Sequence, residues 1–219
     1  MLRVTDLYDL SHSLAGEWLA GFTYPHEALE GIADCIRRLG AGLDPNEYHS
    51  PAEAVWIHKT ATVAPSAAIT GPCIIGPGSE VRHCAYIRGS ALVGAECVVG
   101  NSTELKNVIL FDRVQVPHYN YVGDSILGYR AHMGAGSITS NVKSDRQPVV
   151  LRDGQERLPT QRKKIGALVG DHVEVGCNAV LNPGTILGRG ASVYPTASVR
   201  GTVPENHIHK LDGSMVKRS

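Results

Sequence analysis

The chain is poor in aromatic residues, which make up 5% of its 219 residues. A core with so few large rings must be narrow and filled mainly by Val, Ile and Leu. Positive and negative residues balance at 21 each, so no basic field favours nucleic acid or an anionic membrane surface. No apolar run approaches the ~20 residues that a membrane-spanning helix needs. We therefore expect no nucleic-acid partner and no membrane partner.

Paired cysteines are also lacking. The five cysteines form an odd set with no Cys-x-x-Cys spacing, and the N-terminal stretch has none of the basic-then-apolar order of a signal peptide. Such thiols are typical of a reducing compartment. The sequence therefore predicts a cytoplasmic protein with reduced cysteines, of which Cys73 and Cys97 occupy small-residue positions of the core.

What the chain has instead is a six-residue period of aliphatic residues. The period holds over Ile57, Val63, Ile69, Ile75, Val81, Ile87, Val93, Val99 and Leu105, and again over Val169, Val175, Leu181, Leu187, Val193 and Val199. It fits neither a helix nor an alternating strand and is typical of hexapeptide β-helix repeats. We predict a mainly β fold, a left-handed parallel β-helix with three hexads per coil. Because parallel sheets are usually covered on both faces, we also expect a homotrimer.

Three segments depart from this period and divide the chain. Residues 1–52 carry a helical apolar pattern and are expected to form an N-terminal helical cap on the first coil. Residues 53–203 form the β-helix domain. Within it, residues 142–164 are rich in charge and contain the hairpin signal Arg152-Asp153-Gly154, which predicts a protruding arm near a binding cleft. Residues 204–219 are expected to form a C-terminal tail that frays.

Polar and ionisable residues gather between residues 101 and 141. Glu104 and Lys106 flank the inward residue Leu105, so both are expected to point outward. Arg88 lies one coil before Lys106, and the two stacked cations suit a phosphate or a carboxylate. The alternative is that both are solvated surface cations, because exposed charges contribute little.

Four sequence elements in this region resemble one family. They are E-L-K-N at 104–107, P-H-Y-N-Y-V-G-D at 117–124, G-A-G-S-I-T-S-N at 134–141 and V-G-D-H-V-E-V-G at 169–176. Their order is similar to the acetyltransferase domain of bacterial bifunctional glucosamine-1-phosphate acetyltransferase/N-acetylglucosamine-1-phosphate uridyltransferase. The arm and the R-K-K-I-G-A-L-V-G-D after it are still more similar to the C-terminal domains of archaeal sugar-1-phosphate nucleotidyltransferases. The resemblance implies an N-acetyltransferase that uses acetyl-CoA and an amino-sugar phosphate or a nucleotide-linked amino sugar.

The resemblance also implies a role for each matching residue. His118 stands at the position of the general base, which takes a proton from the sugar amine as the amine attacks the thioester. Histidine suits this task because its ordinary pKa lies near neutral pH. Glu104 matches the glutamate that orients this base. Five further positions match: Arg88, Lys106 and Tyr121 for the sugar phosphate, Asn141 for the acceptor and Ala135 for the acyl-CoA.

Three positions depart from the bacterial pattern. His132 stands in place of a sugar-binding asparagine, Val142 in place of a tyrosine, and Cys177 in place of a serine near the thioester. We expect His132 to bind substrate and Cys177 to lie at the co-substrate. The sugar's identity stays open, and either Lys163 or Lys164 fits the family's loop lysine.

The nucleotidyltransferase half of these relatives has no counterpart here. Residues 1–50 contain no glycine-rich nucleotide loop and are too short for a nucleotide-binding α/β domain. We therefore expect the acetyl step alone, which requires no metal.

Two other interpretations stay open. γ-Type carbonic anhydrases share the expected fold and hold zinc through three histidines, for which His83, His118 and His132 are candidates. However, Gly123 stands where a histidine five residues after His118 would be needed. The chain could also be a non-catalytic partner or regulatory subunit of a separate sugar nucleotidyltransferase. Such a subunit would not need a base, an acid and two cations together.

Overall fold

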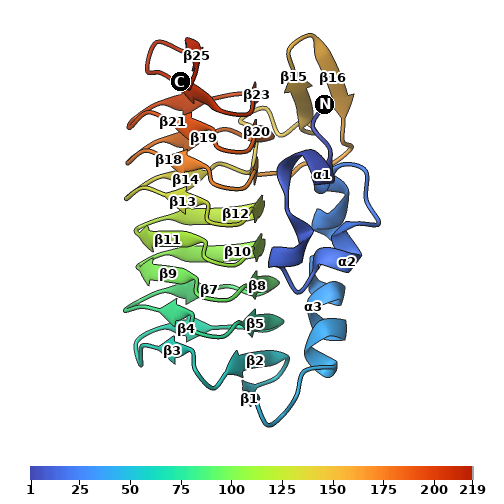
Figure 1. The fold of residues 1–219 in the computed structure, drawn as a ribbon, viewed down its shortest axis with the longest axis vertical. Helices are drawn as coiled ribbons and strands as arrows, with labels where there is room; N and C mark the ends of the chain where they lie inside the picture. The colour runs from blue at the N-terminus through green and yellow to red at the C-terminus, as the bar shows by residue number, and fades with distance from the viewer. Residues whose placement is uncertain (219) are drawn as a thin grey trace.

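The structure is a computed structural model that describes residues 1–218, and it shows a parallel β-helix (Figure 1). Short strands stack coil upon coil, and each full coil places one strand on each of three faces. Residues of the six-residue period point into the prism, where Ile75, Val81 and Ile87 are at most 1% exposed. The predicted β-helix is therefore confirmed.

We number the faces in the order in which the chain visits them. The first face holds β2 (Val55–His58), β5 (Cys73–Ile75), β8 (Ala91–Val93), β17 (Ala167–Val169), β20 (Thr185–Leu187) and β23 (Thr202–Val203). The second face holds β3 (Thr62–Val63), β6 (Glu80–Val81), β9 (Val98–Asn101), β11 (Gln115–His118), β13 (His132–Met133), β18 (Glu174–Val175), β21 (Ser192–Val193) and β24 (His207–His209). The third face holds β4 (Ala68–Ile69), β7 (Tyr86–Ile87), β14 (Ile138–Thr139), β19 (Val180–Leu181) and β22 (Ser198–Val199). Two longer strands, β10 (Glu104–Leu110) and β12 (Tyr121–Leu127), begin on the third face and continue on the first.

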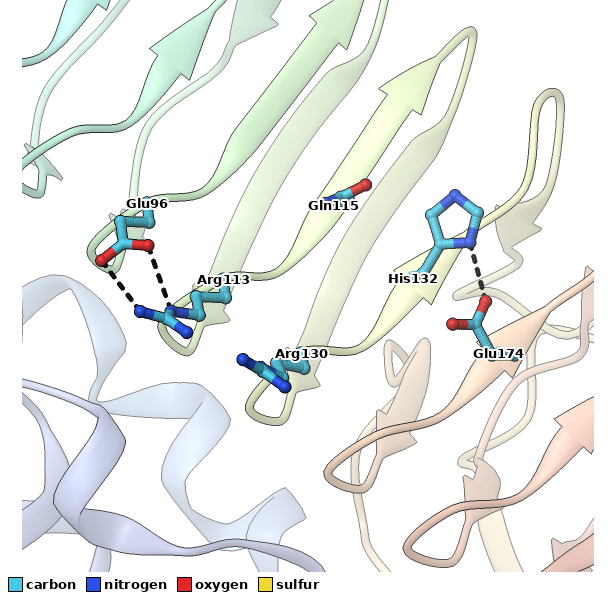
Figure 2. Close-up of a pocket in the computed structure, with 6 residues that line it drawn as sticks. All are labelled: Glu96, Arg113, Gln115, Arg130, His132 and Glu174. Carbon is cyan, nitrogen blue, oxygen red and sulfur yellow. Dashed lines mark hydrogen bonds and ion pairs between the residues drawn. The ribbon is translucent and has the colours of Figure 1, made fainter.

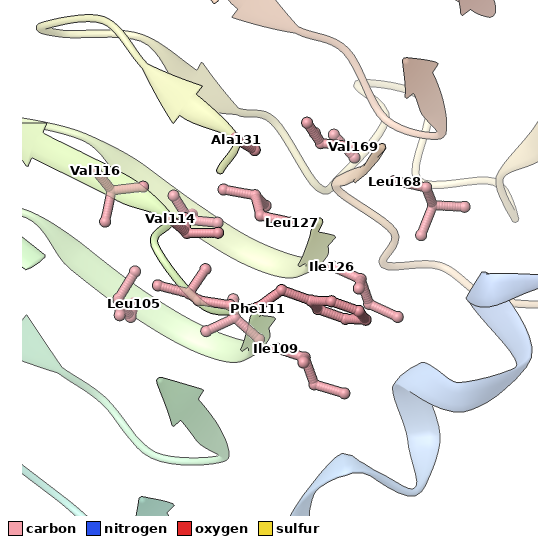
Figure 3. Packing of buried hydrophobic residues seen from close by; sticks show 14 of the residues in the cluster. Leu105, Ile109, Phe111, Val114, Val116, Ile126, Leu127, Ala131, Leu168 and Val169 are labelled. Atoms are coloured by element: carbon pink, nitrogen blue, oxygen red, sulfur yellow. The ribbon is translucent and has the colours of Figure 1, made fainter. Parts of the chain in front are cut away.

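The first face is apolar on its outer side as well as its inner side. Between β2 and β23, the strands of this face contribute outward residues that are buried: Ile74, Leu92, Ile109, Ile126, Leu168 and Ile186. Strands with apolar residues at consecutive positions are typical of parallel sheets covered on both sides. Figure 3 shows Ile109, Ile126 and Leu168 on the side of the N-terminal segment, whereas Leu105 and Val116 lie inside the prism.

The N-terminal helices cover this first face (Figure 1). They are α1 (Val4–Leu7), η1 (Leu10–His12), α2 (Gly16–Leu19), η2 (Pro25–Glu30) and α3 (Ile32–Ala41). The longest, α3, lies against β5, β8 and β10, and η2 lies against β12. Tyr8, 2% exposed, packs its ring 5.1 Å from that of Phe111. The helices therefore lie along a face and not over the end of the first coil, where we expected a cap.

One antiparallel strand is added at each end of the stack. β1 (Tyr48–Ala52) pairs antiparallel with β2 beside the first coil. At the other end β25 (Met215–Lys217) pairs antiparallel with β24, which itself continues the parallel ladder from β21. The described part of the tail is therefore folded onto the last coil, in contrast to the frayed tail that we expected.

Coils in the middle of the stack are one residue shorter than their neighbours. Leu92 pairs with Ile109, and Ile109 with Ile126, at a spacing of seventeen residues. The shortening falls at the corner between the third and first faces, where Asn107 and Asp124 have left-handed φ angles of 54° and 48°. Asn and Asp tolerate this conformation better than most residues do. This corner carries much of the candidate site.

The arm is a hairpin of β15 (Val150–Asp153) and β16 (Glu156–Pro159). An antiparallel bridge between Val142 and Lys164 closes its base. Its position beside the last coils and the N-terminal segment is visible in Figure 1. Within residues 1–218, no helix has the length and apolar character to cross a bilayer.

Candidate active site

Three of the proposed site residues share one corner, between the second and third faces. His118 ends β11, Ala135 lies in the next turn above it, and Cys177 lies one coil further on. Backbone hydrogen bonds stack these turns: the Gly136 N–H donates to the His118 carbonyl at 2.9 Å, and the Asn178 N–H donates to the Ala135 carbonyl at 2.8 Å. The His118 and Cys177 side chains are exposed. A base and a thiol thus line the same edge, two coils apart.

The third face carries a polar network centred on Asp124, which is 3% exposed. Its Oδ1 accepts a hydrogen bond from Asn107 Nδ2 at 3.0 Å, and its Oδ2 accepts one from Asn141 Nδ2 at 2.6 Å. Lys106 Nζ lies 3.2 Å from Oδ2. Because charge-assisted hydrogen bonds satisfy this buried carboxylate on both oxygens, its partners are held in fixed positions.

Tyr121, which opens β12 three residues after His118, belongs to this network. The Asn141 Nδ2 donates to the Tyr121 Oη at 3.2 Å. Partial burial, together with the nearby carboxylates of Asp124 and Glu104, raises the pKa of the Tyr121 phenol above its usual value. The phenol therefore remains a neutral hydrogen-bond donor over the ordinary pH range.

The two cations expected to stack do lie in adjacent coils. The Arg88 N–H donates to the Leu105 carbonyl at 2.8 Å, which sets Arg88 beside Lys106 on the third face. Each cation has its own carboxylate: Arg88 Nη1 lies 3.0 Å from Glu104 Oε1, and Lys106 pairs with Asp124. The positive charge available to a ligand is therefore smaller than two free cations would provide.

Glu104 faces Arg88 and not His118. Within residues 1–218, no hydrogen bond joins the Glu104 carboxylate to the His118 ring. The reason is geometric, because Glu104 opens β10 on the third face while His118 ends β11 on the second. No direct contact between Glu104 and His118 in this structure supports an orienting role for Glu104.

His132 lies apart from the other candidates. It opens β13 on the second face, and its Nδ1 lies 2.8 Å from Glu174 Oε2. Figure 2 shows it across a shallow polar surface from Arg113 and Arg130, with Gln115 between them. The structure therefore does not bring His132 to the network of Tyr121 and Asn141.

Two residues of the site were not identified from the sequence. Asp124 and Asn107 were given no role, although they connect Lys106 to Asn141. The signal was present in the spacing, because the step from Val122 to Leu127 is five residues instead of six. Where a corner of a β-helix is one residue shorter than in regular coils, the side chains at that corner point in different directions and contact different neighbours.

The histidines considered as zinc ligands lie apart from one another within one chain. Within the described residues, no group of three or more His, Cys, Asp or Glu side chains is placed to hold a metal ion. His83 lies on the same corner as His118 but two coils away, and His132 pairs with Glu174.

Comparison with known families gives one match over most of the β-helix. The family described as the GMPPB C-terminal domain matches residues 69–211. The chain belongs to this family.

The curated relatives are longer proteins. The bifunctional protein GlmU of Methanococcus maripaludis (strain C5) is 32% identical over 135 residues, which cover 61% of this chain and 33% of that protein. The bifunctional sugar-1-phosphate nucleotidylyltransferase/acetyltransferase of Sulfurisphaera tokodaii is 32% identical over 126 residues, which cover 58% of this chain and 31% of that protein. The chain thus spans about a third of the length of these relatives.

Solved structures show a more distant likeness. A mutant of perosamine N-acetyltransferase from Caulobacter crescentus, in complex with CoA and GDP-perosamine, is 17% identical with a TM-score of 0.40. The match covers 74% of this chain and 56% of that one. A putative acetyltransferase from Bacillus cereus is 19% identical with a TM-score of 0.42, covering 75% of this chain and 77% of that one.

Proposed function

We propose that the chain is an acetyl-CoA-dependent N-acetyltransferase whose acceptor is an amino-sugar phosphate or a nucleotide-linked amino sugar. The observation that carries this proposal is the shared corner of His118, Ala135 and Cys177, which adjoins the network of Tyr121 and Asn141. A base and a co-substrate edge thus lie at one corner of the third face, and fixed polar groups for an acceptor extend from that face to its other corner. The name of the Sulfurisphaera tokodaii relative, which includes acetyltransferase, supports the same assignment.

In this proposal His118 acts as the general base. Its exposed imidazole accepts the proton of the acceptor amine as the nitrogen attacks the thioester carbon. The tetrahedral intermediate then collapses, forming the amide and releasing the thiolate of CoA, which leaves as the thiol after taking up a proton. No covalent enzyme intermediate is needed, so Cys177 contributes only to the surface that the acyl-CoA contacts.

The third-face residues position the acceptor. Asp124 holds the amide of Asn141, which in turn donates to the neutral phenol of Tyr121. Arg88 with Lys106 attracts the anionic part of the sugar. Glu104 fixes the guanidinium of Arg88. We further propose a homotrimer in which adjoining protomers cover the exposed His118 corner, to be checked by sedimentation equilibrium.

The deciding experiment is a thiol-release assay with acetyl-CoA against a panel of amino-sugar phosphates and nucleotide-linked amino sugars. The variant His118→Ala should lower kcat by about 10²–10⁴-fold, because that is the usual contribution of a general base, with little change in CoA binding. His83→Ala is the matched control, since His83 lies in the same column of the same corner two coils away. Full activity of His118→Ala would overturn the assignment.

The family match favours a second candidate function. The chain belongs to a family named for the C-terminal domain of GMPPB. The Sulfurisphaera tokodaii relative is named as a bifunctional sugar-1-phosphate nucleotidylyltransferase/acetyltransferase. A non-catalytic subunit that binds a separate sugar nucleotidyltransferase is therefore the alternative. Failure of every acceptor in the panel, together with co-purification of such an enzyme, would favour it.

A further inference from the structure

A second candidate binding site lies between the arm and the last coils. The cavity has a volume of 160 Å³ and is bounded by Val149 and Arg152 of the arm and by Gly184 and Arg200 of the β-helix. Lys143, at the base of the arm, completes one side. Sites for drug-sized ligands usually measure about 300–1,000 Å³. The cavity therefore suits one compact group and not a whole nucleotide.

The charges around this cavity have one sign. Its lining includes Lys143, Arg152 and Arg200 and no carboxylate. Lys143 pairs with Asp145 at 3.0 Å, whereas no ion pair within the described chain involves Arg152 or Arg200. Two unneutralised guanidinium groups at one cavity contrast with the ladder of Arg88 and Lys106, in which each cation already has a partner.

Glycine allows the arm to form the wall of the cavity. A Cβ at Gly184 would lie 2.7 Å from Val149 Cγ1 and 3.0 Å from Leu151 Cδ2, so the arm packs where this side chain is missing. Thr202 Oγ1 donates a hydrogen bond to the Arg152 carbonyl at 2.8 Å and fixes the strand that carries the arginine. The position of Arg152 is thus determined by packing and not by chance exposure.

The backbone N–H of Arg200 lies at the edge of the third face. In earlier coils the N–H at the equivalent position donates to the carbonyl of the next strand, as Thr70 does to Ile87 and Asn182 does to Val199. β22 is the last strand of this ladder in the described part of the chain, so no strand above it accepts from the N–H of Arg200. The N–H of Arg200, a residue that lines the cavity, is thus left without a strand partner among the described residues.

We propose that this cavity is a phosphate-binding site, recognised by Arg152 and Arg200 with Lys143 at its side. Arg200 occupies the same outward position as Lys106, four strands further along the third face. At about 4.8 Å per strand the two lie roughly 19 Å apart, so this site is separate from the Arg88–Lys106 ladder. The cavity would bind phosphate whether or not the chain transfers an acetyl group.

Isothermal titration of the full chain with inorganic pyrophosphate tests the proposal. Arg152→Gln and Arg200→Gln should each weaken binding about tenfold or more, because charge-assisted bonds from arginine are strong. Arg157→Gln is the matched control: Arg157 lies in the same hairpin opposite Arg152 but bonds to the Gly154 carbonyl and does not line the cavity. Equal affinity in all three variants, or no saturable binding to the parent chain, would overturn the proposal.

Glycine variants keep every charge of the cavity, so they test whether the position of the arm matters for binding. Gly184→Ala should displace the arm and weaken binding, whereas Gly154→Ala at the hairpin turn, where a Cβ would meet nothing within 4 Å, should not. Unchanged affinity of Gly184→Ala would contradict a site formed by the docked arm. Adenosine 3′,5′-bisphosphate and uridine diphosphate, titrated in parallel, distinguish a co-substrate phosphate from a nucleotide-sugar phosphate as the natural occupant.

Discussion

The first and third faces of the β-helix share their inward side chains and differ in what they present outward. On the first face Ile109 and Ile126 point outward and are buried beneath the N-terminal segment. On the third face several outward residues are polar or charged instead, among them Arg88, Glu104 and Lys106. The six-residue period thus builds the prism, while the residues between its positions decide whether a face is covered or binds a ligand.

The largest effect should follow from placing a charge on the covered face. Ile109→Asp would leave a carboxylate without a partner under the N-terminal segment, so we expect a loss of at least about 3 kcal/mol, on the scale of the larger core truncations. Val98→Asp, at an outward and half-buried position of the second face, should cost about 1 kcal/mol or less. Urea unfolding of the two variants checks this, and similar losses would contradict the difference between faces.

A smaller effect should follow at the end of α3. A Cβ at Gly40 would overlap the ring of Trp56, whereas a Cβ at Gly42 would lie no closer than 3.6 Å to its nearest neighbour. Helix propensity alone favours Ala over Gly by about 1 kcal/mol, but overpacking costs about 1–3 kcal/mol. We therefore expect Gly40→Ala to lower the thermal midpoint and Gly42→Ala to leave it nearly unchanged. A more stable Gly40→Ala would show that α3 does not pack closely on this face.

The smallest effect concerns His26, which is buried in η2 where the N-terminal segment meets β12. Burial and the nearby Arg162 lower its pKa, although Glu27 opposes the shift. The neutral ring is thus favoured in the folded state, and stability should fall as the pH drops below the ordinary value of about 6.5. Because His209 shifts in the same direction, the measurement is the difference in urea midpoint between the parent chain and His26→Gln across this range. An unchanged difference would contradict the assignment.

Local patterns in the sequence were enough to predict the prism, because residues such as Ile75 and Val81 repeat at a fixed step and must point inward. The consecutive apolar residues Ile74 and Ile75 also indicated that the first face is covered on its outer side. We nevertheless assigned the N-terminal segment to the end of the stack. Which face a separate segment packs against depends on contacts between distant residues, and no short-range pattern encodes them.

The candidate site could be predicted only in part. Outward positions such as Arg88 and Lys106 follow from the period, and so does their stacking. The partner of Glu104 does not, because the period leaves open whether its side chain reaches Arg88 on the same face or His118 on the neighbouring one. The separation of His132 from Tyr121 likewise depends on their lying on different faces, the second and the third.

The reversed strands at the two ends have a consequence for how the molecule behaves in a crowded solution. A parallel β-helix has no intrinsic length, because the strands of its last coil expose the same backbone hydrogen-bonding groups that every earlier coil uses to pair with the next. β1 covers the edge of β2, and β25 covers the edge of β24, with a chain of opposite direction, so a second molecule cannot simply continue the parallel ladder at those two edges. End-to-end growth of molecules into a filament is thereby hindered on one face at each end of the stack.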